Sequence, residues 1–265
     1  MGKKDFGVIL RRLGNKAKLA DKIIPLFLPH ETYIEPFFGA GGIFFAKPRA
    51  KQNFLNDLDG DVANLWRLVA EDKQGLIEWL ELMPISEELF LEWGRGKLES
   101  DPILKACRFL MLSNFGYMGA PDTLRLRQGA NSKTVLMRNI KKVQLDLNAQ
   151  NNTFTNKDFR KAIKSIAFKD ENDRQKCFMF LDPPYLSSTD NYSHSFTESD
   201  SADLFKTSVD SRIPFAMSEF DQPFILEQAR HYNLNIHVLG ERQNMKNRRT
   251  EILITNYQLN QPTLF

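Results

Sequence analysis

The chain has 265 residues, of which 36 are lysine or arginine and 33 are aspartate or glutamate, so its formal net charge is +3. This length is sufficient for one large domain or a domain with an insertion, and the 21 phenylalanines indicate a folded protein rather than a disordered one. The small net charge permits nucleic-acid binding without requiring it, so the distribution of charge is more informative than its sum. The sequence shows no signal peptide and no apolar run of membrane-spanning length, and we expect a soluble, cytoplasmic protein.

The first motif joins a short apolar strand to a cluster of glycines. Residues 33–37 are followed by Gly39, Gly41 and Gly42, and then by the apolar segment Ile43–Ala46. Glycines at a strand-to-helix turn let a ligand approach the backbone, and the N-terminus of the following helix favours polar or anionic groups. The spacing does not match the G-x-G-x-x-G dinucleotide fingerprint. Taken alone, such a turn is as often structural as functional.

A second predicted strand, residues 53–56, ends at Asp57, which lies 18 residues after Gly39. An acid at about this distance, at the end of the next strand, is where a nucleotide-binding sheet holds ribose hydroxyls. The alternative is that Asp57 only forms a turn.

The region from Asp59 to about Ile140 has apolar residues at helical spacing, interrupted by glycines, and predicts a helical insertion. Within it, residues 95–142 contain ten basic and three acidic residues, a balance of +7. We interpret this region as a surface that contacts DNA phosphates rather than as an ordinary solvated face. Trp66 and Trp79 are interpreted as core residues. The candidate DNA-binding residues are two arginines in a loop from Gly116 to Ala130 and two later lysines: Arg125, Arg127, Lys141 and Lys142.

The most informative stretch is Asp182-Pro183-Pro184-Tyr185, which follows an apolar strand at residues 178–181. The prolines have a fixed φ and keep the residue before each of them out of the helical region, so the corner is stiff. Two acceptors, the Asp182 carboxylate and the Pro183 carbonyl, can hold the hydrogens of a planar amino group while the Tyr185 ring stacks on its π-face. The alternative is a rigid strand-to-loop turn with no chemical role.

The rest of the chain predicts more elements of an α/β sheet. Residues 152–155 are a candidate strand, and further strands are expected at 214–218, 234–239 and 251–256. A helix is expected from Pro223 to about Tyr232, with Asp221 near its N-cap and Asn233 at its end.

The loops and cysteines give three further expectations. The mostly polar stretch Gly240–Thr250 leaves no room for a covering helix, so the last two strands should form an antiparallel hairpin at the sheet edge. The polar run Ser187–Ser201 is interpreted as a loop over the site, although a plain surface loop fits it equally well. Cys107 and Cys177 are expected to be buried thiols, and the four histidines form no metal-ligand pattern.

The motifs together resemble one family, the Dam-type (D12 class) DNA adenine-N6 methyltransferases, which use S-adenosylmethionine. The resemblance is carried by the segment Glu35-Pro36-Phe37-Phe38-Gly39-Ala40-Gly41, by Asp57, and by Asp182-Pro183-Pro184-Tyr185. Arg12-Leu13-Gly14-Asn15-Lys16 is similar to the family's first cofactor segment, with Lys16 at its lysine and Arg12 in place of its usual aromatic residue. Asp158-Phe159 looks like the segment that holds the cofactor adenine. The motif order resembles the group that inserts its target-recognition domain between the glycine turn and the proline corner.

The resemblance implies a Rossmann-like methyltransferase sheet of the α/β class, with a C-terminal antiparallel hairpin and an inserted helical target-recognition domain. The catalytic domain is expected to comprise residues 1–58 and 146–265, and the inserted DNA-binding domain residues 59–145. The implied catalytic residues are Asp182, Pro183, Pro184 and Tyr185. The implied cofactor-binding residues are Arg12, Lys16, Glu35, Pro36, Phe38, Gly39, Ala40, Gly41, Asp57, Asp158, Phe159 and Asp182.

The hypothesis at this stage is methyl transfer from S-adenosylmethionine to the N6 amino group of adenine in duplex DNA, giving S-adenosylhomocysteine without a metal. The adenine would be flipped out of the stack. GATC is the target that the resemblance implies, and a monomer is the simplest oligomeric state. Three alternatives stay open: an RNA adenine-N6 methyltransferase, a cytosine-N4 DNA methyltransferase, and a non-catalytic nucleic-acid-binding module of the same fold.

Overall fold

A computed structural model of the protein describes residues 7–11, 14–71, 73–117, 120–125, 133–186, 196–243 and 248–259. The chain divides into two compact units. The first, here called the helical unit, comprises Met1–Ala17, Gly39–Lys47 and Asp59–Asn156. The second, here called the sheet unit, comprises Lys18–Phe38, Pro48–Leu58 and Lys157–Phe265. No helix in these described ranges is both long and apolar enough to cross a membrane.

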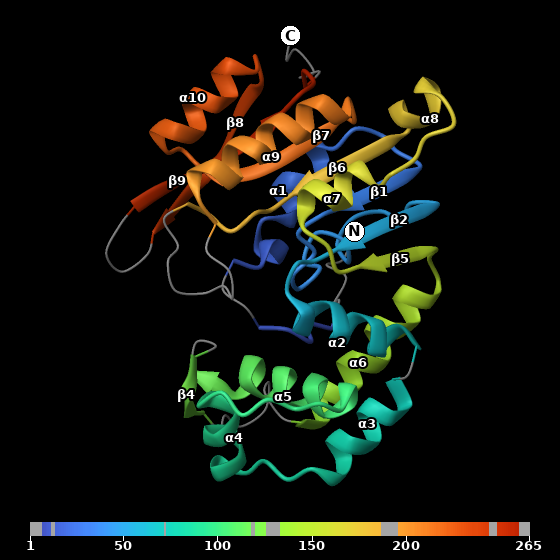
Figure 1. Ribbon diagram of the computed structural model, residues 1–265, viewed down its shortest axis with the longest axis vertical. Coiled ribbons are helices and arrows are strands. Elements are labelled where there is room, and N and C mark those ends of the chain that lie inside the picture. Colours follow the sequence, from blue (N-terminus) through green and yellow to red (C-terminus); the bar gives the residue numbers. More distant parts are fainter. Residues whose placement is uncertain are drawn as a thin grey trace. The chain divides into compact units, whose positions relative to one another are not determined.

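The helical unit is built mainly from five α-helices (Figure 1). Their apolar residues recur at helical spacing, and in α2 the residues Val62, Leu65, Trp66 and Val69 are buried. Helix α5 begins at Pro102 because Asp101 caps it, accepting hydrogen bonds from the backbone N–H groups of Ile103 and Leu104, both at 2.9 Å. The elements of this unit are the 3₁₀ turn η1 (Lys16–Lys18), α2 (Gly60–Glu71), α3 (Lys73–Leu82), α4 (Glu87–Gly94), α5 (Pro102–Phe115), β3 (Gly116–Tyr117), β4 (Ala120–Leu124), α6 (Lys133–Asn148) and β5 (Asn152–Thr155).

Two sequence expectations in the helical unit were wrong. The expected loop from Gly116 contains a short antiparallel hairpin, β3–β4, in which Gly116 pairs with Leu124. Strand β3 has only two residues, and β4, Ala-Pro-Asp-Thr-Leu, contains a proline and no apolar run, which explains why a loop was predicted. Trp66 is buried as expected, but the Trp79 side chain is 44% exposed because it lies on the outer face of α3.

The sheet unit contains six strands of the main sheet, and this sheet has the strand order β5-β2-β1-β6-β7-β9-β8. Strands β2, β1, β6 and β7 pair in parallel with one another in that order, whereas β9 is antiparallel to both β7 and β8. The elements of this unit are α1 (Ala20–Ile23), η2 (Ile24–Leu26), β1 (Thr32–Glu35), β2 (Gln52–Asn56), α7 (Phe159–Lys164), α8 (Glu171–Gln175), β6 (Cys177–Leu181), α9 (Glu198–Ser211), β7 (Phe215–Phe220), α10 (Pro223–His231), β8 (Asn235–Gln243) and β9 (Arg248–Thr255).

The two faces of this sheet have different partners. One face packs its buried aliphatic residues, such as Ile34, Met179 and Met217, against α7, α9 and α10, which Figure 1 shows in yellow and orange. The opposite face is aromatic, and there Phe27 packs against Phe178 with ring centroids 4.4 Å apart. Because strand side chains alternate between faces, the residues next to the aliphatic ones belong to the aromatic face.

The predicted strands and the C-terminal antiparallel hairpin are confirmed, with β8 at the sheet edge. The helix after Pro223 is also confirmed, and it ends before Asn233, whose φ of 53° is left-handed. Its N-cap is Gln222, so Asp221 lies next to the N-cap as expected, and the Asp221 carboxylate accepts a hydrogen bond from the Thr250 N–H.

Two helical expectations in the sequence were wrong. Residues 43–46 form successive turns rather than a helix, and Pro48 follows directly. The end of the expected loop Ser187–Ser201 is helical, because α9 begins at Glu198 with a capping box formed by Thr197 and Asp200. Residues 187–195 lie outside the described ranges.

The division into units differs from the predicted domain boundaries. Residues 146–156, which were assigned to the catalytic part, group with the helical unit, as do 1–17 and 39–47. The N-terminal segment belongs there because Asn114 on α5 donates to the Ile9 carbonyl at 2.8 Å and Asn139 on α6 donates to that of Val8 at 3.0 Å. The assignment of target recognition to residues 59–145 stays a prediction.

Candidate active site

The proline corner lies at the carboxyl end of a fully buried strand. All five residues of β6 are buried, and the chain becomes partly exposed at Asp182, directly after the strand. Strand β6 pairs with β1, which continues to β2 on its other side, so the strand order reverses direction between β1 and β6. Open α/β sheets bind ligands outside the carboxyl ends of the strands at such a reversal point. Asp182 therefore occupies the position where this fold places its ligands.

The Tyr185 ring is held in place by groups from two other strands. Its hydroxyl donates to Glu251 Oε1 on β9 at 2.9 Å and hydrogen-bonds with Ser218 Oγ on β7 at 2.8 Å. Its ring packs edge-on against that of Phe220, with centroids 4.6 Å apart and an interplanar angle of 76°. The ring is 8% exposed, so it is fixed in one orientation with only a small part accessible.

Ser218, Phe220 and Glu251 were not predicted as site residues. Their signal in the sequence was weak: one serine within an apolar strand, and one carboxylate at the start of another. Both polar residues are buried, and buried polar groups in a strand are normally retained because they satisfy a partner. Only the structure identifies that partner as Tyr185.

Burial and nearby carboxylates keep the tyrosines of this region neutral. The pKa of Tyr185 is raised well above its ordinary value, first by burial and then by the negative charges of Asp182 and Glu251. The pKa of Tyr33 on β1 is raised in the same way, by burial and by Glu35 and Asp182. The negative charge of Asp182 contributes to both increases in pKa.

Glu35 ends β1 with a buried, oriented carboxylate. It accepts a hydrogen bond of 2.9 Å from the Tyr33 hydroxyl, two residues earlier on the same face of the strand. Glu35 is 2% exposed, and Tyr33 is fully buried. A charged group so deeply buried at the ligand-binding edge of a sheet is more typical of a binding site than of a structural core.

Asn56, which was not predicted, fixes the segments on either side of it. Its side-chain amide donates to the carbonyl of Pro36 at 3.0 Å and to that of Lys157 at 2.9 Å, and its Oδ1 accepts from the Lys157 N–H. The Asn56 carbonyl also accepts from the Phe38 N–H at 2.8 Å. The predicted ribose-binding residue Asp57 follows directly, so Asn56 sets the relative position of three predicted cofactor segments.

Asp158 and Phe159 open helix α7. The Asp158 side chain caps this helix by accepting from the Arg160 N–H at 2.9 Å, and it also pairs with the Arg160 guanidinium at 3.0 Å. Arg160 binds Asp200 and Asp203 on α9 as well. Phe159 is buried between Phe37 and Phe196, whose ring centroids are 5.5 and 6.1 Å from its own. Asp158 thus has a structural role here besides the cofactor role that the sequence implied.

In the helical unit, Lys16 and the glycine turn lie against each other. A Cβ atom on Gly42 would collide with Asn15 Oδ1 and would lie 2.9 Å from the Ala17 nitrogen, so this position requires glycine. Lys16 is buried, and its ammonium group donates to the Gly14 carbonyl at 3.1 Å. Trp66 on α2 anchors the turn by donating to the Gly39 carbonyl at 2.8 Å.

Gly39 provides a test of whether a ligand fits at this turn. Its φ is 49°, and no described atom lies within 4 Å of a Cβ placed on it. The backbone is therefore open to close approach at this residue, which is what binding the cofactor at the glycine turn requires.

The predicted DNA-binding residues are only partly described. Arg125 follows β4 and is half-buried, and its N–H donates to the Phe115 carbonyl at 2.7 Å. Lys141 and Lys142 are exposed on α6. Arg127 and the predicted cofactor residue Arg12 lie outside the described residues.

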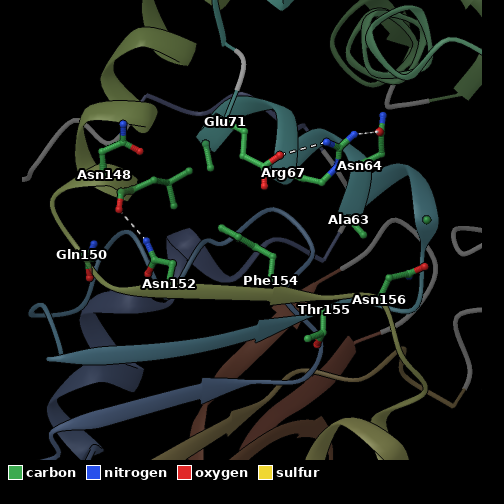
Figure 2. Close-up of a pocket in the computed structure, with 13 residues that line it drawn as sticks. Ala63, Asn64, Arg67, Glu71, Asn148, Gln150, Asn152, Phe154, Thr155 and Asn156 are labelled. Carbon is green, nitrogen blue, oxygen red and sulfur yellow. Dashed lines mark hydrogen bonds and ion pairs between the residues drawn. The ribbon is translucent and has the colours of Figure 1, made fainter.

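A separate pocket of about 790 Å³ lies within the helical unit, between α2, the end of α6 and β5. Figure 2 shows Arg67 on α2 bound to Glu71 and Asn64, with Asn152 and Phe154 of β5 across the pocket. None of the predicted site residues lines it, so the sequence motifs do not point to this pocket. Among the described residues, no cluster of three or more His, Cys, Asp or Glu side chains could hold a metal ion.

Comparison with known proteins assigns the family. Residues 13–245 match the model of the D12 class N6 adenine-specific DNA methyltransferases. The chain belongs to this family. It is an adenine-specific DNA methyltransferase, its substrate is DNA, and the family implies S-adenosylmethionine as the methyl donor.

The names of two relatives of this D12-class methyltransferase indicate restriction-modification enzymes. Type II methyltransferase M1.LlaDCHI of Lactococcus lactis subsp. cremoris is 26% identical over 268 residues, covering 87% of this chain and 91% of the relative. Modification methylase StsI of Streptococcus sanguinis is 24% identical, and 94% of this chain aligns with 42% of that protein. Among solved structures, the rRNA methyltransferase aviRa of Streptomyces viridochromogenes matches 96% of this chain and 93% of its own, at 11% identity and a TM-score of 0.41.

Proposed function

We propose that the enzyme methylates the N6 amino group of an adenine that it extrudes from duplex DNA. The amino group is inaccessible to an enzyme while the base stays stacked, so the nucleotide is flipped out at a cost of a few kcal/mol. The observation that carries the proposal is the fixed Tyr185 ring, held by Ser218, Glu251 and Phe220 beside Asp182. A ring in one fixed orientation gives an extruded base a platform, and stacking on it recovers about 1 to 3 kcal/mol.

Asp182 and the Pro183 carbonyl act as the two acceptors for the N6 hydrogens. The N6 lone pair of adenine is delocalised into the ring and is therefore a weak nucleophile. Holding both hydrogens would favour a pyramidal nitrogen with an available lone pair, and one of the two protons would leave to solvent once the nitrogen is methylated. Such positioning and electrostatic stabilisation supply most of the rate in a displacement of this kind.

S-adenosylmethionine, when bound, supplies a methyl group activated by its sulfonium. By family resemblance, Lys16 and Gly39 contact this cofactor, Asp57 accepts hydrogen bonds from its ribose hydroxyls, and Phe159 contributes to its adenine site. Glu35 adds a buried carboxylate whose orientation is fixed by Tyr33. By family resemblance, Asp182 would contact the methionine end of the cofactor as well as hold the target amine.

Sequence readout is assigned to the β3–β4 hairpin and the residues after it. Arg125 follows this hairpin directly, and arginine reads guanine bidentately through O6 and N7. The exposed Lys141 and Lys142 contact phosphates and contribute affinity without specificity. GATC is the proposed target by family resemblance.

The test is incubation of the protein with tritiated S-adenosylmethionine and, separately, duplex DNA, single-stranded DNA and RNA. We expect label in the duplex, in adenine alone, and at one short sequence when the modified positions are mapped. A 2-aminopurine base at the target position should become fluorescent on binding if the base leaves the stack. Label mainly in RNA or in cytosine would contradict the proposal, and no label in any substrate would point to a non-catalytic module.

A further inference from the structure

The catalytic tyrosine lies on the same sheet face as an arginine of the C-terminal hairpin. Phe220 on β7 pairs directly with Glu251 on β9, so both side chains belong to one face. Arg249 lies two residues before Glu251 and therefore belongs to that face as well. Its guanidinium carbon lies over the Phe220 ring, 5.4 Å from the centroid.

Phe220 thus contacts both Tyr185 and Arg249. The two centroid distances, 4.6 Å from the Tyr185 ring and 5.4 Å from the guanidinium carbon, bring the cation within about 10 Å of the catalytic ring. Phe220 is 6% exposed and Arg249 is half-buried, so the contact restricts the arginine side chain before any ligand binds. A guanidinium over a ring face is attracted by the quadrupole of that ring.

The hairpin that carries Arg249 concentrates positive charge. Residues 242–249 include Arg242, Lys246, Arg248 and Arg249 and no acidic residue. In the strand pairing, Arg242 stands directly opposite Arg249. Positive charges concentrated in one hairpin attract a polyanion.

We propose that Arg249 binds a backbone phosphate of the DNA strand that carries the target adenine, next to the base received by Tyr185. This inference rests on the proposed extrusion of adenine from duplex DNA. The guanidinium fork matches the geometry of phosphate oxygens and can bind two of them at once. The C-terminal hairpin is then a second DNA-contacting element, distinct from the β3–β4 hairpin, and it fixes the backbone beside the extruded nucleotide.

The experiment compares Arg249→Gln with the wild type in binding to a duplex that contains the mapped target site, as a function of salt. The slope of log K against log[salt] is negative, and loss of one phosphate contact should reduce its magnitude by about 0.9. Binding should weaken about 10- to 150-fold. Arg249→Lys keeps the charge without the fork, so it should retain the wild-type slope but bind more weakly than the wild type. Arg230→Gln is the matched control, because Arg230 lies exposed in the last turn of α10 and its loss should change neither quantity.

Three results would overturn the proposal. One is an unchanged salt slope and affinity in Arg249→Gln while the wild type methylates the duplex. Another is a loss of S-adenosylmethionine affinity in calorimetry, which would place Arg249 in the cofactor site. The third is a lower unfolding temperature with an unchanged slope in both Arg249 variants, which would make the arginine a packing residue. If instead the wild type labels RNA rather than duplex DNA, the proposed function fails, and the salt slopes on RNA still decide whether Arg249 binds phosphate.

Discussion

Asp182 is the residue on which the proposed chemistry depends most directly, because it is partly exposed directly after β6 and its negative charge raises the pKa of both Tyr33 and Tyr185. Asp182→Ala removes an acceptor for the target amine and should lower turnover by at least about 100-fold, as loss of one preorganised electrostatic contact does. The fold should be retained, since little core depends on a partly exposed side chain. The measurement is single-turnover methyl transfer alongside thermal unfolding.

Asp210→Ala is a suitable control for this loss of charge, because Asp210 is exposed on α9 and pairs only locally with Lys206. Its activity should equal that of the wild type. Near-normal turnover in Asp182→Ala would remove Asp182 from the mechanism.

The proposed role of Asp57 is to bind the cofactor rather than the target base. Asp57→Ala should weaken S-adenosylmethionine binding by about 10- to 150-fold, because it loses charge-assisted hydrogen bonds worth about 1.5 to 3 kcal/mol. Asp57→Asn keeps one acceptor oxygen and should lose less. Titration calorimetry without DNA measures both, and equal affinity in all three proteins would reduce Asp57 to a turn former.

The sequence predicted the site residues that belong to a continuous motif, but not the residues from other strands that position them. Asp182 and Tyr185 are recognisable because they are adjacent along the chain. Ser218 and Glu251 reach Tyr185 only through strand pairing, which has no local signature. Asn56 was not predicted for the same reason, since its hydrogen-bond partners lie 20 and 101 residues away along the chain.

At the scale of elements, the proposal that the β3–β4 hairpin reads bases while α6 contacts phosphates can be tested by substitution. Arg125→Ala should relax the preference for guanine at one position of the site, at a cost of about 1 to 3 kcal/mol for that base pair. Lys141→Ala or Lys142→Ala should instead weaken binding to all sequences alike and reduce the salt dependence. Binding to a set of single-base variants of the mapped site measures both effects. If Arg125→Ala keeps the wild-type preference at every position, readout lies elsewhere in the chain.

The prediction of helices and strands succeeded where the sequence has a clear apolar run and failed where it has none. The strands of the sheet and the C-terminal hairpin follow from apolar runs and from the length of the linker between them. Strand β3 has only two residues and β4 contains a proline and no apolar run, and the capping box of α9 was masked by the polar composition around Thr197. A helix after the glycine turn was expected from apolar composition alone, which does not distinguish a helix from successive turns.

For the molecule as a whole, buried thiols and phenols predict a loss of stability in alkali. Burial raises the pKa of Cys107 to about 12 from 9.0, and burial also raises that of Cys177. The pKa values of Tyr33, Tyr185 and Tyr257 are raised from 10.0, with burial as the largest cause. The unfolded chain releases these protons at lower pH than the folded protein does. Above about pH 9 it therefore binds fewer protons, and the free energy of unfolding should fall as pH rises.

The decrease should approach at most about 1.4 kcal/mol per pH unit for each group that stays protonated in the folded state, and stability should be fully present below about pH 9. Urea unfolding at several values between about pH 8 and pH 11 measures it. Cys107→Ser removes one titrating group and should make the decrease shallower. A constant free energy of unfolding across this range would show that the groups titrate alike in both states.

The bond between Tyr185 and Glu251 also has a consequence for the enzyme during its own synthesis. The two residues are 66 positions apart, and the acceptor lies in the last strand of the sheet. At a translation rate of about 5 to 20 residues per second, roughly 3 to 13 seconds separate the making of the motif from the making of its anchor. Until β9 leaves the ribosome and pairs with β7, Tyr185 lacks its bond to Glu251. A nascent or prematurely terminated chain therefore carries the whole Asp-Pro-Pro-Tyr motif without one of the groups that orient its tyrosine.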